Sequence, residues 1–149
     1  MFDNKEYIND TIIDISYDNT PKHIINIDNS SFINSYDKSS FTNLMCNKSK
    51  FKNSFNNTTT TNLDTEECNI IKSFNDSIID KLYLYYSKID NSFNNCKIHK
   101  LIIDDKVIIN DSFNNCIIDE LHILNIEDIK NIEQLKYKKL IVKSHMNLI

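Results

Sequence analysis

Residues 92–123 read SFNNCKIHKLIIDDKVIINDSFNNCIIDELHI, and one block of five residues occurs twice within them. The block that begins at Ser92 and ends at Cys96 returns 20 residues later, from Ser112 to Cys116. The triplet Ser-Phe-Asn also begins at Ser54 and Ser73, which lie 38 and 19 residues before Ser92. A fixed period of this length is the sequence signature of a repeat architecture. The period therefore decides the fold class before any single segment does.

A column of leucines runs in phase with this block, at spacings of 19 or 20 residues. Its members are Leu44, Leu63, Leu82, Leu101, Leu121 and Leu140. Mostly apolar residues also recur three residues before and two residues after each leucine, so that a unit reads x-I-x-x-L-x-I. The L-x-I part alternates between two faces, which is strand periodicity. Stacked units of this kind bury one continuous apolar core that a single unit cannot form.

A third apolar column follows the second at Phe51, Ile70, Ile89, Ile108 and Ile129. Amphipathic helices are the alternative, but Ile and Asn are weak helix formers and the best one, Ala, is absent. A short helix stays open only within residues 126–138. The sequence predicts a mainly β repeat solenoid, a leucine-rich-repeat-like stack of 19-20 residue coils with short parallel strands. We expect an N-terminal lead-in or cap over residues 1–30 and the solenoid over residues 31–149.

Composition excludes several function classes. The chain of 149 residues has no Gly and one Pro, Pro21, so a glycine-rich phosphate loop cannot exist in it. The formal net charge of -4 gives no basic footprint for nucleic acid. No apolar run is long enough to span a membrane, and the N-terminal residues lack the pattern of a signal peptide. We therefore expect no nucleic-acid partner, no membrane partner, no cofactor and a cytoplasmic location.

The repeat resembles a known family. The block Phe93-Asn94-Asn95-Cys96, followed by spaced Ile and Leu, resembles the Phe-x-x-Cys block that precedes the strand in BspA-like leucine-rich repeats. The likeness covers roughly residues 55–142, although the units here are shorter and lack the Pro and Gly of that family's turns. The bias toward residues with A/T-rich codons resembles the leucine-rich-repeat families of insect poxviruses and other large DNA viruses, which would place the chain in the host cytoplasm. Membership implies a binding scaffold, not an activity.

The cysteines, histidines and asparagines are candidates for chemistry, but their positions indicate structural roles. Cys96 and Cys116 share one repeat position and are predicted to stack as small buried side chains. No C-x-x-C pair exists, so we expect no metal site, and His99 and His122 fall on the outward side of predicted strands. We predict no catalytic residue. The asparagines that follow each Phe (Asn56, Asn75, Asn94 and Asn114) are predicted to form a ladder that bonds turn backbone and adopts left-handed φ.

The outward strand positions give the candidate binding surface. Two outward columns, one residue and three residues after each leucine, gather aromatic and apolar side chains. The predicted partner-binding residues are Tyr83, Tyr85, Tyr86, Ile102, His122, Leu124 and Ile141. The predicted function is a non-catalytic protein–protein interaction scaffold. Two alternatives stay open: a degenerate repeat protein or fragment without independent function, and a carbohydrate-binding or -cleaving β-helix, which predicts a row of convergent carboxylates.

Overall fold

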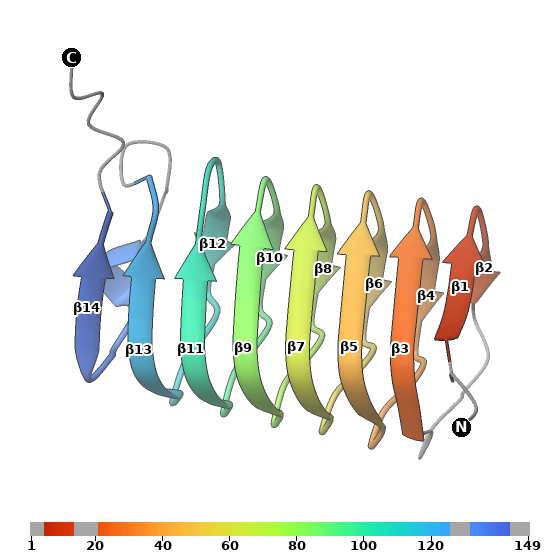
Figure 1. Cartoon of the computed structure of the whole chain (residues 1–149), viewed down its shortest axis with the longest axis horizontal. Helices are drawn as coiled ribbons and strands as arrows, with labels where there is room; N and C mark the ends of the chain where they lie inside the picture. Colours follow the sequence, from red (N-terminus) through yellow and green to blue (C-terminus); the bar gives the residue numbers. More distant parts are fainter. Residues whose placement is uncertain (1–4, 14–20, 126–131, 144–149) are drawn as a thin grey trace.

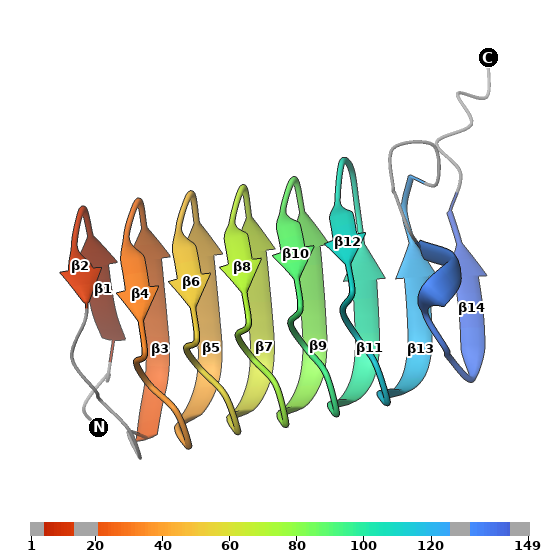
Figure 2. The same cartoon turned by 180° about the vertical axis from the view of Figure 1, so that it is seen from behind.

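The computed structural model describes residues 5–13, 21–125 and 132–143, which form a β-solenoid of two parallel sheets (Figure 1). The eight-stranded sheet, here the long sheet, has the order β1 (Lys5–Asn9), β3 (Pro21–Asp28), β5 (Ser40–Asn47), β7 (Thr59–Glu66), β9 (Ile78–Tyr85), β11 (Lys97–Ile103), β13 (Ile117–Ile123) and β14 (Lys139–Val142). The six-stranded short sheet, seen from behind in Figure 2, contains β2 (Ile12–Ile13), β4 (Ser31–Ile33), β6 (Lys50–Lys52), β8 (Asn69–Ile71), β10 (Lys88–Asp90) and β12 (Ile108–Asn110). The predicted mainly β repeat solenoid is confirmed.

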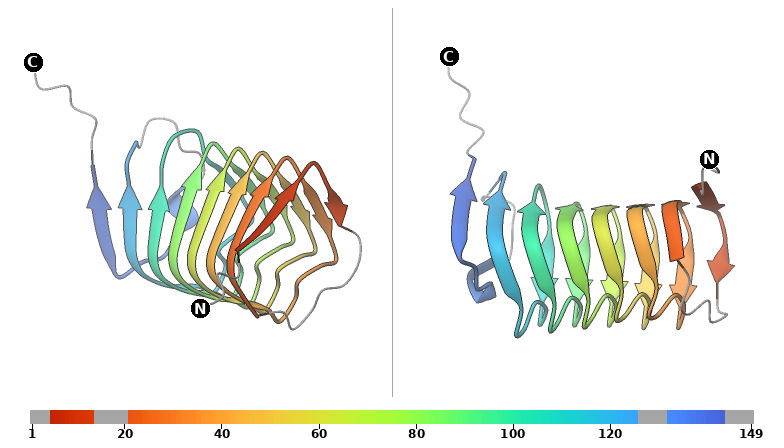
Figure 3. Two further views of the ribbon diagram at one scale, coloured as in Figure 1. Left: turned by 45° about the vertical axis from the view of Figure 1, so that its right-hand side comes forward. Right: turned by 60° about the horizontal axis from the view of Figure 1, so that its bottom comes forward.

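Like residues lie over like residues along the long sheet. The strand register pairs Leu44 with Leu63, Leu63 with Leu82, and so on through Leu101 and Leu121 to Leu140. The first five of these leucines are fully buried, whereas Leu140 in the last strand is 43% exposed. Figure 3 shows the coils following one another along a single axis. The predicted leucine column is therefore a continuous spine of the core from Leu44 to Leu121, whereas Leu140 continues the register but is not buried in the core.

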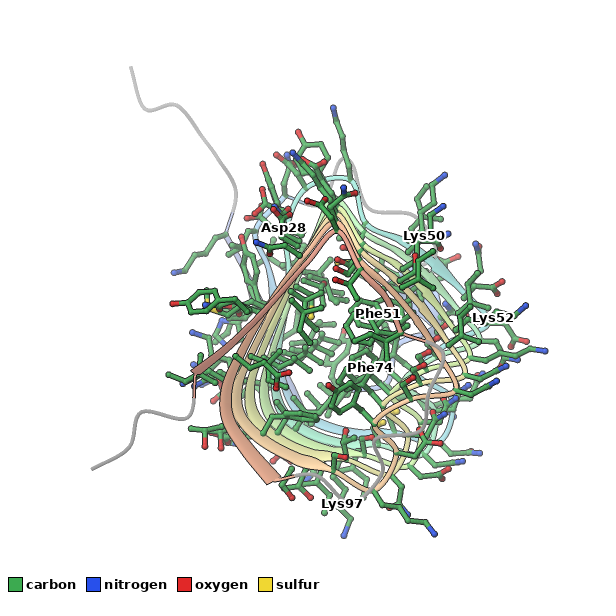
Figure 4. The ribbon with its side chains drawn as sticks, turned by 90° about the vertical axis from the view of Figure 1, so that its right-hand side faces the viewer. Asp28, Lys50, Phe51, Lys52, Phe74 and Lys97 are labelled. Carbon is green, nitrogen blue, oxygen red and sulfur yellow. The ribbon has the colours of Figure 1, made fainter. Side chains whose placement is uncertain are left out.

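Aromatic rings fill the space between the two sheets. Phe74 and Phe93 stack with ring centroids 5.2 Å apart, and Phe93 and Phe113 with centroids 5.1 Å apart. Phe51, in the neighbouring column, meets Phe55 and Phe74 edge to face. Viewed along the solenoid axis, Phe51 and Phe74 point into the interior (Figure 4). These rings stack because the coils repeat at the spacing of adjacent strands, about 4.8 Å, which suits offset aromatic pairs.

The corners of the coils use left-handed backbone without glycine. In the coil from Asn53 to Glu67, the residues with positive φ are Asn53 (51°), Phe55 (57°), Asn57 (56°) and Glu67 (53°). The same four positions recur in the coil from Lys72 to Tyr86. A residue with a Cβ pays a steric cost in this region, and Asn and Asp tolerate it best. Because Phe55 and its equivalents accept this conformation, packing of the ring in the core must offset the cost.

Hydrogen-bond ladders run along the corners from coil to coil. The hydroxyl of Ser73 accepts the backbone N–H of Ser54 at 3.0 Å, and the hydroxyl of Ser92 accepts that of Ser73 at 3.0 Å. The side-chain oxygen of Asn75 likewise accepts the N–H of Asn94 at 2.8 Å. The prediction that the asparagine ladder hydrogen-bonds the backbone of the turns is thus confirmed. The expected left-handed φ is wrong for these asparagines, since the residues on either side of each one carry it.

The cysteines take serine positions in these ladders. The thiol of Cys96 accepts the N–H of Ser77 at 3.5 Å and donates to the carbonyl of Phe74 at 3.1 Å. Cys116 does the same one coil later, with the N–H of Cys96 and the carbonyl of Phe93. Cys96 is buried as expected, but Cys116 is partly exposed. The pair is stacked, and each thiol has a hydrogen-bonding role that a purely apolar side chain could not fill.

The single coil of 20 residues shifts the short sheet by one position. Ile89 of β10 pairs with Ile109 of β12, and Ile109 is fully buried. Ile108, which the repeat placed in this column, is half-buried on the other face instead. The leucine pairing before this corner is unchanged. In the corner itself, the N–H of Tyr86 bonds to the carbonyl of Asp105. The extra residue is therefore accommodated around Asp104 and Asp105.

Both ends of the chain join the same stack. β1 pairs with β3 and β2 pairs with β4 in parallel, so the coil pattern extends back to Lys5, ahead of the boundary expected at residue 31. Near the other end, a short 3-10 helix covers Ile132–Gln134, and Leu135 is buried. In the rest of the segment where a helix stayed open, residues 135–138 are not helical, and residues 126–131, which include Ile129, lie outside the described residues.

Candidate functional site

The long strands bend, which divides the outward face of the long sheet into two facets. Ile79 pairs with Ile98 and Lys81 with Lys100, but no pair joins Asp80 and His99 between them. Asp80 and Lys81 are both exposed although they are consecutive, so the strand turns at this point. The first facet lies before the bend and the second facet after it. The second facet carries both outward columns of the predicted binding surface.

The seven predicted partner-binding residues fall in one area of the second facet, here the tyrosine patch: Tyr83, Tyr85, Tyr86, Ile102, His122, Leu124 and Ile141. Register pairs Tyr83 with Ile102, Ile102 with His122 and His122 with Ile141. Tyr85 ends β9, Tyr86 occupies the corner after it with a φ of 51°, and Leu124 follows β13. The structure therefore brings side chains from four successive coils together. All except the exposed Tyr86 are half-buried.

Ring contacts hold the three tyrosines against one another. The rings of Tyr85 and Tyr86 meet edge to face with centroids 4.4 Å apart, and those of Tyr83 and Tyr85 lie 6.4 Å apart. The ammonium group of Lys106 sits 5.2 Å from the ring centroid of Tyr86, within the range of a cation–π contact. The tyrosines are thus preorganised, which lowers the entropy lost when such side chains are covered by a partner.

Two hydrogen bonds fix the polar groups of the patch. The Tyr83 hydroxyl donates to Asp104 Oδ2 at 2.5 Å. Burial and, to a smaller extent, this contact raise the pKa of Tyr83 above its ordinary value. His122 Nε2 lies 2.9 Å from Glu120 Oε2, and the His122 side chain is only 15% exposed. This hydrogen bond holds the pKa of Glu120 below its ordinary value. His122 is therefore held within the patch, with little of its side chain exposed.

An acidic hollow adjoins the tyrosine patch toward the N-terminal coils. It encloses about 340 Å³ and is bordered by the carboxylates Asp28, Asp64 and Glu66, with Met45 and Tyr83 among the other lining residues. Burial raises the pKa of Asp64, and the charge of Lys81 opposes that shift. The outward columns identify these residues from the sequence. Only the structure shows that they border a hollow.

A second hollow of about 420 Å³ lies on the first facet. Its lining includes Ile78 and Ile117, which are among the exposed apolar residues, and an ion cluster of His99, Asp119 and Lys138. Asp119 lies 2.7 Å from Lys138 Nζ and 3.2 Å from His99 Nδ1. Hydrogen bonds from Lys138 and His99 hold the pKa of Asp119 below its ordinary value. His99 is exposed as predicted, and its side chain contacts Asp119.

The carboxylates on the second facet do not form a row. In one outward column Asn47 separates Asp28 from Glu66, and Tyr85 follows Glu66. Within the described ranges, no group of three or more His, Cys, Asp and Glu side chains is arranged to hold a metal ion. No helix among the same residues is long and apolar enough to cross a membrane.

The chain was compared with protein-family models, curated proteins and solved structures. No family model matches the chain, and no curated protein and no solved structure matches it either.

Proposed function

We propose that this chain is a non-catalytic protein–protein interaction scaffold that binds a protein partner through the tyrosine patch. One observation carries the proposal: the strand register aligns Tyr83, Ile102, His122 and Ile141 across four adjacent strands, beside Tyr85. Tyrosine and isoleucine offer large contact areas, and clustered aromatic residues are typical of binding surfaces.

The different roles of the side-chain positions within a coil support this proposal. The inward columns supply the core, and the corner ladders consume the buried hydroxyls, amides and thiols. The residues of the tyrosine patch belong neither to the core nor to these ladders. A repeat of this kind presents several such columns in a fixed geometry, which suits recognition of a protein surface better than chemistry on a small substrate.

We further propose kinship with BspA-like leucine-rich repeats and a cytoplasmic location, which is the host cytoplasm for a viral chain. Phe93 and Cys96 of the Phe-x-x-Cys block are both buried structural residues, which supports the kinship. All four cysteines are free thiols, the state that the cytoplasm maintains. We propose neither a nucleic acid nor a membrane as the partner, and no cofactor.

The test compares partner recovery by three forms of the protein in quantitative affinity capture. We expect Tyr83→Ala with Tyr85→Ala to lose a protein that the unchanged chain recovers. The matched control, Asn69→Ala with Asp90→Ala, alters two outward residues of the short sheet and should recover it in full. Circular dichroism checks that all three retain the fold. Equal recovery by the tyrosine variant would remove the patch from the proposal.

The two alternatives predict different outcomes of simple measurements. A degenerate repeat without independent function should unfold over a broad temperature range, whereas a domain with one continuous spine should melt cooperatively. A carbohydrate-binding solenoid should itself be retained on a column of immobilised polysaccharide. The variant with Tyr83→Ala and Tyr85→Ala should not be retained. Retention on such a column without capture of any protein would favour that alternative.

A further inference from the structure

The lysines of the N-terminal coils gather on one side of the solenoid, here the lysine face. It comprises Lys50 and Lys52 on β6, Lys72 in the corner after β8, and Lys88 on β10, all of them exposed. Figure 4 shows Lys50 and Lys52 pointing away from the core on the side opposite the long sheet. None of the ion pairs found among the described residues involves these lysines, although Asp90 shares their face. The net charge of the chain therefore conceals a basic surface.

The acidic hollow and the lysine face carry matching columns. In the hollow, the register places Asp28, Asn47 and Glu66 on successive strands. On the lysine face, the register places Lys50, Asn69 and Lys88 on successive strands. Each column is thus charge, asparagine, charge, with opposite signs on the two faces. Both columns repeat at the spacing of adjacent strands, so their outer charges are separated by the same distance, about 9–10 Å.

We propose that the lysine face of one copy docks onto the acidic hollow of a second copy of this chain. When the columns face each other, Lys50 and Lys88 of one copy meet Asp28 and Glu66 of the other, and the two asparagines meet between them. The symmetry of each column permits this pairing with the coil axes parallel or antiparallel. Long lysine side chains also bring apolar stems that can cover Met45, which is 49% exposed within the hollow.

The neighbouring columns favour the antiparallel arrangement. With parallel axes, the column of Lys52, Ile71 and Asp90 would lie over Asn26, Met45 and Asp64. That arrangement sets Asp90 against Asp64, and like charges in contact oppose binding. With antiparallel axes, Asp90 moves away from the hollow. Because the two faces belong to different sides of one molecule, the contact is heterologous, and repeating it produces an open assembly rather than a closed dimer.

This inference goes beyond the proposed function, because it uses the lysine face and the acidic hollow and needs no other protein. The test measures oligomeric state by sedimentation velocity over a range of protein concentration. We expect self-association at an ionic strength of about 0.01 M and its loss at about 1 M, where charges are screened within about 3 Å. A chain that stays monomeric at low ionic strength at every concentration overturns the proposal.

Neutralising variants identify the faces. Lys50→Gln with Lys88→Gln removes the basic column, and Asp28→Asn with Glu66→Gln removes the acidic column. Each pair by itself should weaken association by about tenfold or more, the effect expected from losing two ion pairs. Lys97→Gln with Lys136→Gln, and Asp76→Asn with Asp80→Asn, change net charge equally at other exposed positions. These control pairs should associate like the unchanged chain.

Mixing the two neutralised variants gives the decisive result. One retains an intact hollow and the other an intact lysine face, so an equimolar mixture can form a single intact contact. We expect a one-to-one dimer in the mixture and no larger species. Association that survives in both variants, or a mixture that stays monomeric, contradicts the proposed contact. A monomeric chain that binds heparin through Lys50 and Lys88 would instead assign the lysine face to an anionic polymer.

Discussion

The hydroxyl of Tyr83 in β9 donates a hydrogen bond to the carboxylate of Asp104, which lies one coil further along the solenoid. The bond ties the tyrosine patch to the corner that contains the extra residue of the 20-residue coil. Burial of Tyr83 and its contact with Asp104 both raise the pKa of the phenol, because the phenolate would be poorly solvated and would face a negative charge.

The first prediction concerns this phenol. Asp104→Asn should lower the pKa of Tyr83 toward its ordinary value, but only partly, because the contribution of burial remains. The measurement is phenolate absorbance against pH, with Tyr83→Phe as the variant that identifies the signal. A raised pKa in the folded state means that the stabilising contribution is fully present below about pH 10 and is lost as the pH rises further. The Asp104→Asn variant should therefore lose less stability above that pH. Identical titration of both proteins would contradict the role of Asp104.

The second prediction separates the inward and outward columns of one strand. Leu101→Ala should lower the free energy of unfolding by about 2–5 kcal/mol, because Leu101 is fully buried in the spine and its truncation leaves a cavity. Its neighbour Ile102 is half-buried on the outward face, so Ile102→Ala should cost no more than about 1 kcal/mol. Urea denaturation compares the two variants. Equal losses would mean that the strand does not separate a core face from an outward face.

The third prediction concerns left-handed corners built without glycine. Lys72 is exposed with a φ of 50°, so Lys72→Gly should remove a steric cost and stabilise the protein by up to about 1 kcal/mol. Lys97 is also exposed but begins β11 in extended backbone, so Lys97→Gly should destabilise by about 0.5–1 kcal/mol. Thermal melts of both variants test the difference. Destabilisation by both substitutions would contradict the assigned conformation of Lys72.

The fourth prediction orders the thiols by reactivity. Cys116 is partly exposed, and a hydrogen bond from Cys96 lowers its pKa, whereas burial raises the pKa of Cys46. Since the thiolate is the nucleophile, iodoacetamide should label Cys116 before the other thiols. Cys96→Ala removes the side-chain contribution of Cys96 but leaves the bond from its backbone N–H, so it should slow that labelling only in part. Peptide mass mapping over time provides the rates, and faster labelling of Cys46 in the folded protein would overturn the order.

Much of the fold was predictable because stacking imposes a simple rule on the sequence. Leu44 through Leu121 occupy the same place in successive coils, so the period that aligns them in the sequence also aligns them in space. The same rule places Tyr83 beside Ile102 and Ile102 beside His122. The predicted patch therefore needed only the period and the alternation of a strand.

The rule failed where the coil changes length. The sequence contains one 20-residue unit, and its period does not say where the additional residue is accommodated. Placing Ile108 in the core column assumed that the residue came after the third column. The structure accommodates it in the corner at Asp104 and Asp105, because the corner can lengthen without breaking the pairing of either sheet.

By itself, the sequence determined the period, the buried columns and the outward columns, because each depends only on which residues recur at one position. The tertiary structure decided the rest. Closure of each coil forces Phe55 and its equivalents into left-handed backbone, assigns Cys96 to a serine ladder and opens the acidic hollow beside Tyr83. These features depend on how two sheets meet at their corners in space, and a repeating pattern of residue types carries no information about that angle.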